Sequence, residues 1–163
     1  PAYEISGYSW PFGPAFDRLS IESKKSQCVK WEQDHLSALY SLTVCEFSRS
    51  GIANETYGAL AAAATGWKID YNELLKYGER IWNVIRMFNV REGIDRRADS
   101  TIPKRFKEPI PSGPAKGHSI TDEDLNKLLD WYYEARGWDK NGIPTRQKLT
   151  ELGLEDVAKD TKS

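Results

Sequence analysis

The sequence has few of the residues that build metal sites or disulfide scaffolds. Its 163 residues include two cysteines, Cys28 and Cys45, and two histidines, His35 and His118. A disulfide-stapled domain uses more cysteines, and a cytosolic protein keeps such a pair reduced. A tetrahedral zinc ion or a cubane iron–sulfur cluster takes about four ligands. These four residues lie in unrelated sequence contexts, so they do not complete such a centre. For either cysteine alone, a small buried apolar role is the simplest interpretation.

An excess of one charge is also absent. The 23 basic and 24 acidic side chains leave a formal charge of -1, which argues against a nucleic-acid binder, because those proteins show a basic excess or stripe. No run of about eighteen apolar residues could span a membrane. The first ten residues, PAYEISGYSW, lack the basic and apolar regions of a signal peptide. We therefore expect a cytoplasmic protein. Since the chain starts with Pro1 and not with Met, we also expect it to begin inside a longer one.

Common catalytic signatures are missing as well. The sequence contains no GxGxxG, Walker loop, HExxH or GxSxG motif. Residues 112–120, SGPAKGHSI, resemble an anion-binding loop, because Gly113 and Gly117 could expose backbone N–H groups near Lys116. A surface turn with a solvated lysine is the simpler interpretation. The acidic run at 122–124 suits the start of a helix. No residue of the chain is predicted to be catalytic.

Helical periodicity is the main pattern that is present. A first helix is expected from about Ser23 to about Leu42, and it delivers Cys45 at or just past its end. Its apolar positions are Val29, Leu36, Leu39 and Leu42. Asn54 is expected to cap an alanine-rich helix that Gly66 ends.

The clearest helix follows Asp70, which stands in a capping-box spacing with Glu73. One face is predicted to consist of Leu74, Gly78, Ile81, Trp82, Ile85 and Phe88, with Lys76, Glu79, Arg80 and Asn83 facing away. Gly78 costs about 1 kcal/mol relative to alanine inside a helix. We therefore expect another helix to approach closely at Gly78.

The helical pattern dissolves over residues 96–120, where one turn around 103–106 and an ordered, proline- and glycine-containing loop are expected. Two shorter helices should follow, one that begins at Thr121 and one that Thr145 caps. The apolar positions of the first are Leu125, Leu128, Leu129 and Tyr132, and those of the second are Leu149 and Leu152. The final KDTKS should fray. No segment alternates with a period of two, so the predicted fold is all-α. It is an irregular multi-helix domain over residues 23–163 with long Pro/Gly-rich connections, preceded by an irregular leader over residues 1–22.

Several strings, in order, resemble one enzyme family. They are KWEQDHLSALYSLTVCEF, GERIWNVIRMFNVREGI, TIPKRF, PIPSGPAKGH and LLDWYYEARGWDKNGIPTRQKLTELGL, and together they cover roughly residues 24–155. Each is weak alone, but the ordered set resembles the carboxy-terminal helical domain of tungsten-containing aldehyde:ferredoxin oxidoreductases.

The resemblance implies an enzyme that oxidises aldehydes to carboxylic acids. In the family a tungsten, or sometimes molybdenum, ion held by two pterins takes the electrons, which pass through a [4Fe–4S] cluster to ferredoxin. Three cluster cysteines come from a middle domain whose closely spaced cysteine group is not in this sequence, and the fourth comes from the last domain. Cys45 matches that fourth ligand, and Cys28 matches none. We expect no cofactor on this chain by itself.

Two positions depart from the family's pattern beside Cys45. The pterin-binding acidic residue five positions earlier is Tyr40 here, and the glycine two positions earlier is Thr43. A phenol does not accept charge-assisted hydrogen bonds as a carboxylate does, and a threonine limits close backbone approach. Tyr40, Thr43 and Val44 are the pterin-motif positions. PAYEISG resembles a family block that a much longer segment follows, with the active-site histidine, and neither His35 nor His118 occupies that motif.

Two functions remain open. The first is a fragment of the oxidoreductase that is inactive alone, with the remaining domains of the same polypeptide and ferredoxin as partners. A homodimer is a further candidate, and neither nucleic acid nor membrane is expected as a partner. The alternative is a non-catalytic helical module, derived from that family, that packs against a partner.

Overall fold

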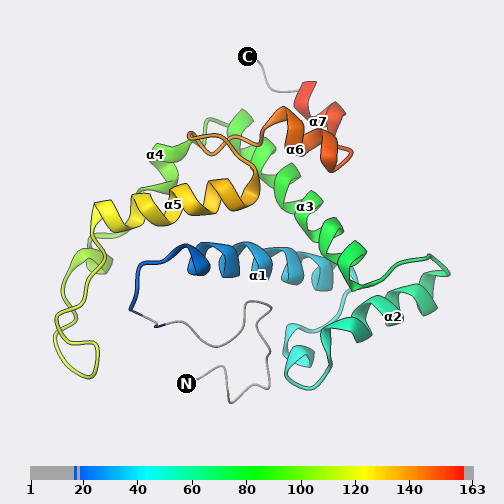
Figure 1. Ribbon diagram of the computed structural model, residues 1–163, viewed down its shortest axis with the longest axis horizontal. Coiled ribbons are helices and arrows are strands. Elements are labelled where there is room, and N and C mark those ends of the chain that lie inside the picture. The colour runs from blue at the N-terminus through cyan, green and yellow to red at the C-terminus, as the bar shows by residue number, and fades with distance from the viewer. Residues whose placement is uncertain (1–16, 18, 160–163) are drawn as a thin grey trace.

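The computed structural model describes residue 17 and residues 19–159 (Figure 1). The predictions for residues 1–16 and for the last four residues lie outside this range. In chain order the elements are α1 (Ser23–Ser41), the 3-10 helix η1 (Glu46–Ser50), α2 (Asn54–Thr65), α3 (Tyr71–Arg91), α4 (Arg96–Asp99), the 3-10 helix η2 (Lys104–Lys107), α5 (Asp122–Arg136), α6 (Arg146–Glu151) and α7 (Glu155–Lys159). Within the described residues, strand pairing is limited to one isolated bridge between Trp138 and Pro144. The all-α prediction is confirmed.

α1 is the central helix, packed most extensively against α3 and then against α5. In Figure 1 α3 crosses one end of α1, while α5 runs alongside α1, and α2 lies beyond the crossing. Ala38, Leu39, Tyr57 and Leu74 join α1, α2 and α3 in one buried cluster. Met87, Leu149, Leu152 and Leu154 form a second one, between α3 and the carboxy-terminal helices.

Local sequence signals predicted most helix ends correctly. The Asp70 carboxylate accepts a hydrogen bond from the Glu73 amide at 2.9 Å. Thr121 and Asp124 form a reciprocal capping box at the start of α5, and Thr145 caps α6. The prediction for α2 was wrong by one residue, because Ala53 occupies the cap position and the helix begins at Asn54.

The close approach predicted at Gly78 is confirmed, and it determines the α1–α3 crossing. A Cβ atom added to Gly78 would lie 1.9 Å from the backbone carbonyl oxygen of Asp34. At this crossing the backbones of the two helices touch, so Asp34 and His35 of α1 are buried although both are polar.

This crossing makes the predicted apolar faces of both helices partly wrong. Leu74 and Gly78 are buried as expected, but Asn83 is fully buried as well, whereas Ile85 and Phe88 are 44% and 54% exposed. On α1, Leu39 is buried, but Val29 is 48% exposed. The reason is that α1 meets α3 at Gly78, whereas Asn83 is buried against Trp138, whose indole N–H donates to it at 2.8 Å. Much of the apolar stripe stays uncovered.

His35 is a packed histidine: its ring stacks on Trp31 with centroids 5.0 Å apart, and its Nδ1 lies 2.8 Å from the Tyr71 hydroxyl. Burial lowers the pKa of His35, so the ring is neutral at pH 7. Within the described residues, no helix is both long and apolar enough to cross a membrane.

Candidate functional site

The end of α1 presents the predicted cluster ligand. α1 ends at Ser41, and Cys45 follows as the residue that precedes η1. Its thiol is free and exposed, whereas Cys28 is buried within α1. Burial raises the pKa of the Cys28 thiol, which favours the neutral, unreactive form. Of the two cysteines, only Cys45 can reach a group outside this chain.

The backbone on both sides of Cys45 is anchored. Val44 is half-buried against the cluster formed by α1, α2 and α3, and its amide donates to the Leu39 carbonyl at 3.2 Å. After Cys45, the Ser48 amide donates to the Cys45 carbonyl at 3.0 Å. The Ser48 hydroxyl lies 2.8 Å from the hydroxyl of buried Tyr57. The thiol therefore stands on a loop that packing and hydrogen bonds hold in place.

Thr43 adopts the left-handed conformation, with φ of 55°. Its amide donates to the Tyr40 carbonyl at 3.0 Å, which makes it the turning point between α1 and Cys45. A β-branched residue is strained there, and glycine is not. The backbone thus supplies a reason for glycine at this position that is independent of any cofactor.

We expect Thr43→Gly to stabilise the chain. Relief of left-handed strain contributes about 1–2 kcal/mol, and the added freedom of the unfolded chain offsets about half of it. The melting temperature should rise by about 2–4 °C in thermal unfolding followed by circular dichroism. Thr56→Gly is the matched control, because Thr56 is exposed inside α2, where glycine costs about 1 kcal/mol. A loss of stability in both variants would contradict the strain at Thr43.

A polar network that the sequence did not reveal surrounds this loop. The exposed Tyr40 hydroxyl donates to a Glu46 carboxylate oxygen at 2.7 Å, and this hydrogen bond raises the pKa of Tyr40. Arg49 pairs with Glu32 of α1 and lies 3.7 Å from Glu46. The spacings of these residues carry no periodic signal across the turn, so sequence reasoning missed them. Tyr40 donates its hydrogen bond within the chain, where a carboxylate would accept one.

The metal-binding side chains of this part of the chain could supply one ligand of a metal cluster. Among the described residues, no group of three or more histidine, cysteine, aspartate or glutamate side chains could hold a metal ion. A cubane cluster needs about four ligands, of which this part of the chain offers one exposed thiol, Cys45. The other ligands of such a cluster must come from elsewhere.

The 112–120 loop does not form the anion-binding nest that its glycines suggested. Gly113 and Gly117 have positive φ, but the amides around them are bonded within the loop. The Gly117 amide donates to the Ile110 carbonyl at 2.8 Å, and the amides of Lys116 and His118 donate to nearby carbonyls. The interpretation as a surface turn is the one that the geometry supports.

The comparisons with known proteins decide the family. The family described as "Aldehyde ferredoxin oxidoreductase, domains 2 & 3" matches residues 2–154. The chain belongs to this family. Tungsten-containing aldehyde ferredoxin oxidoreductases of Pyrococcus horikoshii and Pyrococcus furiosus are each 38% identical to it over 154 residues, which is 94% of this chain and 24% of theirs. The chain therefore spans about a quarter of the length of these relatives.

Two further similar proteins are named for other substrates. The WOR-like subunit of an aliphatic sulfonate oxidoreductase from Pyrococcus furiosus is 43% identical over 68 residues, 42% of this chain and 11% of that subunit. The BamBC active-site complex of benzoyl coenzyme A reductase, solved with 1,5-dienoyl-CoA, has a TM-score of 0.69 and 23% identity over 93% of this chain and 22% of that chain. At that identity the likeness shows the fold alone.

Proposed function

We propose that this chain is the carboxy-terminal helical part of a tungsten-containing oxidoreductase that oxidises aldehydes to carboxylic acids, with ferredoxin as electron acceptor. The observation that carries the proposal is the placement of Cys45. Its free thiol is exposed on an anchored loop at the end of α1. The sequence resemblance matches this residue to the family's fourth cluster ligand. When bound, the tungsten–pterin centre supplies the oxidation and a [4Fe–4S] cluster takes up the electrons.

In this proposal the residues of this chain bind and orient the cofactors. Cys45 provides one thiolate to the cluster, and the anchored Val44 backbone sets the direction from which that thiolate approaches. Tyr40, Thr43 and Val44 are the positions nearest to the pterin in this proposal. Tyr40 contributes a phenol bonded to Glu46 and no carboxylate of its own, so pterin binding here depends on other contacts.

The isolated chain is proposed to be inactive, because the pterin-binding part and the other cluster ligands lie outside it. The remaining domains of the same polypeptide are its first partners, and ferredoxin is a partner of the whole enzyme. In this proposal residues 23–163 form the helical domain, which α1 opens at Ser23, and residues 1–22 are the leader. A cytoplasmic location and a homodimer stay predictions.

Replacing Cys45 should remove the cluster from the whole enzyme. The polypeptide encoded by the full gene is produced anaerobically with tungsten, as wild type, Cys45→Ser and Cys28→Ala. Iron, sulfide and tungsten are measured, together with aldehyde-dependent reduction of a viologen dye. We expect Cys45→Ser to lower the cluster's electron paramagnetic resonance signal and the dye reduction at least about tenfold. Cys28→Ala, whose residue is buried and matches no ligand, should keep both.

The alternative function is a helical module without redox chemistry. The replacement of the family's acidic residue by Tyr40 and of its glycine by Thr43 favours this alternative. A well-folded full-length wild type that contains neither iron nor tungsten under these conditions would establish it. An iron-loaded Cys45→Ser enzyme with normal dye reduction would remove Cys45 from the proposed site.

A further inference from the structure

The outward side of α3 is apolar along most of its length. We define the α3 outer face as Tyr77, Ile81, Val84, Ile85 and Phe88. At the 100° turn per residue of an α-helix these positions fall within a stripe about 100° wide. Four of them are 41% to 54% exposed, and Ile81 is partly buried. Single exposed apolar side chains are ordinary, but a continuous stripe of them marks an interaction surface.

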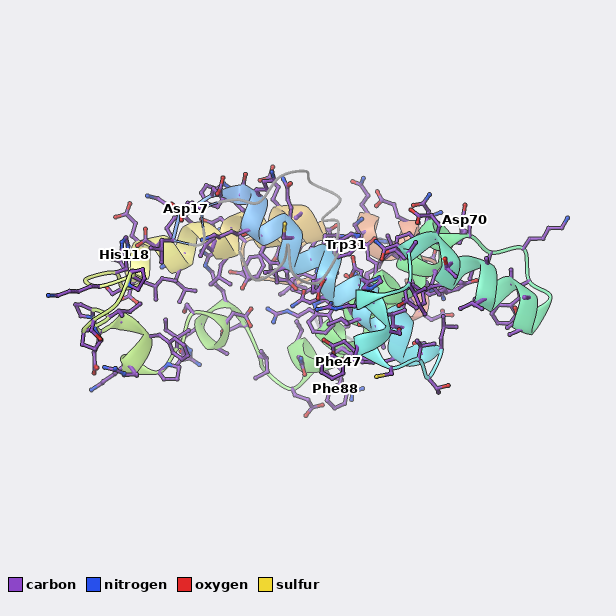
Figure 2. All side chains as sticks on the ribbon, turned by 90° about the horizontal axis from the view of Figure 1, so that it is seen from below. Asp17, Trp31, Phe47, Asp70, Phe88 and His118 are labelled. Carbon is purple, nitrogen blue, oxygen red and sulfur yellow. The ribbon has the colours of Figure 1, made fainter. Side chains whose placement is uncertain are left out.

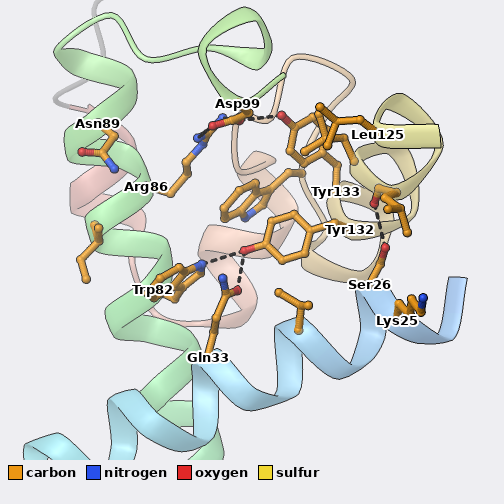
Figure 3. A pocket seen from close by; sticks show the side chains of 15 residues that line it. Lys25, Ser26, Gln33, Trp82, Arg86, Asn89, Asp99, Leu125, Tyr132 and Tyr133 are labelled. Atoms are coloured by element: carbon orange, nitrogen blue, oxygen red, sulfur yellow. Dashed lines mark hydrogen bonds and ion pairs between the residues drawn. The ribbon is translucent and has the colours of Figure 1, made fainter. Parts of the chain in front are cut away.

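A cavity adjoins this face and is suited to an apolar guest. It has a volume of about 590 Å³ and lies between α1, α3 and α5 (Figure 3). Ile85 lines it and also belongs to the outer face, so the two features are continuous. Much of the remaining wall is aliphatic, from Val29, Leu125, Leu128 and Leu129.

Most of the polar side chains on the cavity wall have partners within the chain. The Tyr132 hydroxyl donates to Gln33 Oε1 at 2.7 Å and accepts from Trp82 Nε1 at 2.8 Å. The Asp99 carboxylate accepts hydrogen bonds from two guanidinium nitrogens of Arg86, at 3.0 and 2.6 Å. Figure 3 shows both sets as dashed lines across the pocket. A polar guest would gain little from groups that are already bonded, so an apolar side chain fits best.

We propose that the α3 outer face is the docking site for an amphipathic helix from another part of the same polypeptide. This helix inserts a large apolar side chain into the adjoining cavity. The inference rests on the proposed function for the existence of that part. The relatives have about three quarters of their length outside the matched region, since this chain covers 24% of them. A stripe with helical spacing is the surface into which another helix packs its ridges.

The direction of this face agrees with the cluster site. In Figure 2 Phe88 of the outer face and Phe47 lie along the same edge of the molecule. Phe47 is two residues after Cys45 and is 84% exposed. A domain that spans this side of the molecule would therefore cover both the α3 outer face and the loop of Cys45, although the two lie apart in Figure 1.

Thiol labelling in two forms of the protein tests the proposal. Val84→Cys is placed on the outer face, and Lys76→Cys is the matched control on the polar side of the same helix. Each is made in the 163-residue chain and in the full-gene polypeptide, and maleimide labelling is followed by peptide mass spectrometry. In the short chain both sites should label at similar rates. In the long one, Val84→Cys should label at least about tenfold more slowly while Lys76→Cys is unchanged. Circular dichroism checks that each variant is folded.

Equal labelling of Val84→Cys in both forms would overturn the proposal. Labelling of Val84→Cys in the short chain that becomes slower as the protein concentration rises would overturn it too. Such a result would identify a second copy of the chain as the occupant of the face. The metal assay separates this outcome from the proposed function. A cluster-loaded enzyme with a freely labelled Val84→Cys refutes the docking face alone, whereas a protected face in a metal-free protein refutes the redox function alone.

Discussion

Gly78→Ala should destabilise this protein by about 3 kcal/mol or more and lower its melting temperature by about 6–12 °C. In an exposed helix the same change would stabilise by about 1 kcal/mol. Here the new methyl group would stand 1.9 Å from the Asp34 carbonyl oxygen, with the Asp34 carbonyl carbon at 2.7 Å. Both atoms belong to a helix backbone and cannot rotate away. The two helices must therefore separate, and the buried groups around the crossing lose their packing.

The measurement is thermal and urea unfolding followed by circular dichroism. Gly51→Ala is the matched control, because a Cβ atom there would meet nothing within 4 Å and the Gly51 φ of -134° is open to any residue. Gly51→Ala should leave the melting temperature unchanged or slightly higher. If both variants unfold at the same temperature, α1 and α3 do not touch at Gly78 as described.

Arg136→Met should cost about 3–5 kcal/mol at neutral pH. The Arg136 side chain is fully buried, and one of its guanidinium nitrogens lies 2.5 Å from the Asp34 carboxylate. A second nitrogen donates to Gln33 Oε1 at 2.7 Å, and Nε donates to the Tyr132 hydroxyl at 3.1 Å. Methionine has a similar length but removes every donor. It leaves a buried carboxylate with Lys30 as its remaining partner, at 2.8 Å.

A double-mutant cycle identifies the cause. Asp34→Asn combined with Arg136→Met should be less destabilised than the sum of the two single variants, because the uncompensated buried charge is gone. Urea unfolding gives each free energy. Arg136→Lys keeps the charge but not the planar guanidinium group. Its free energy of unfolding should lie between those of wild type and Arg136→Met. A cost below about 1 kcal/mol for Arg136→Met would show that the ion pair does not hold α1 to α5.

Much of the helical layout could be predicted because its signals are local. The Asp70 cap, the glycine at 66 that ends α2 and the start of α1 at Ser23 each depend on a few neighbouring residues. Cys45 was expected just past the first helix, and it lies there. Such features follow from backbone hydrogen bonding and steric limits, which a short stretch of sequence carries in full.

The faces of the helices could not be predicted in the same way. A hydrophobic stripe indicates that a surface will be covered, but not by which element. Ile85 and Phe88 were expected to share one face with Leu74, yet Leu74 is buried and the other two are exposed. The proposed explanation is that the stripe serves a partner outside this chain, while Asn83 and Arg86 face the interior, where Asn83 accepts from Trp138 and Arg86 pairs with Asp99.

The sequence by itself determined the helices α1, α2, α3, α5 and α6, most of their ends, the free cysteine after α1 and, through its ordered motifs, the family. Only the tertiary structure decided that the helix approaching Gly78 is α1, that Arg136 and Asp34 form a buried pair, and that the outer side of α3 stays open. The physical reason is the sequence separation between the residues that interact. Caps and turns are fixed by neighbours within a few residues, whereas the ion pair joins residues 102 positions apart, and its partners meet only once the helices have packed.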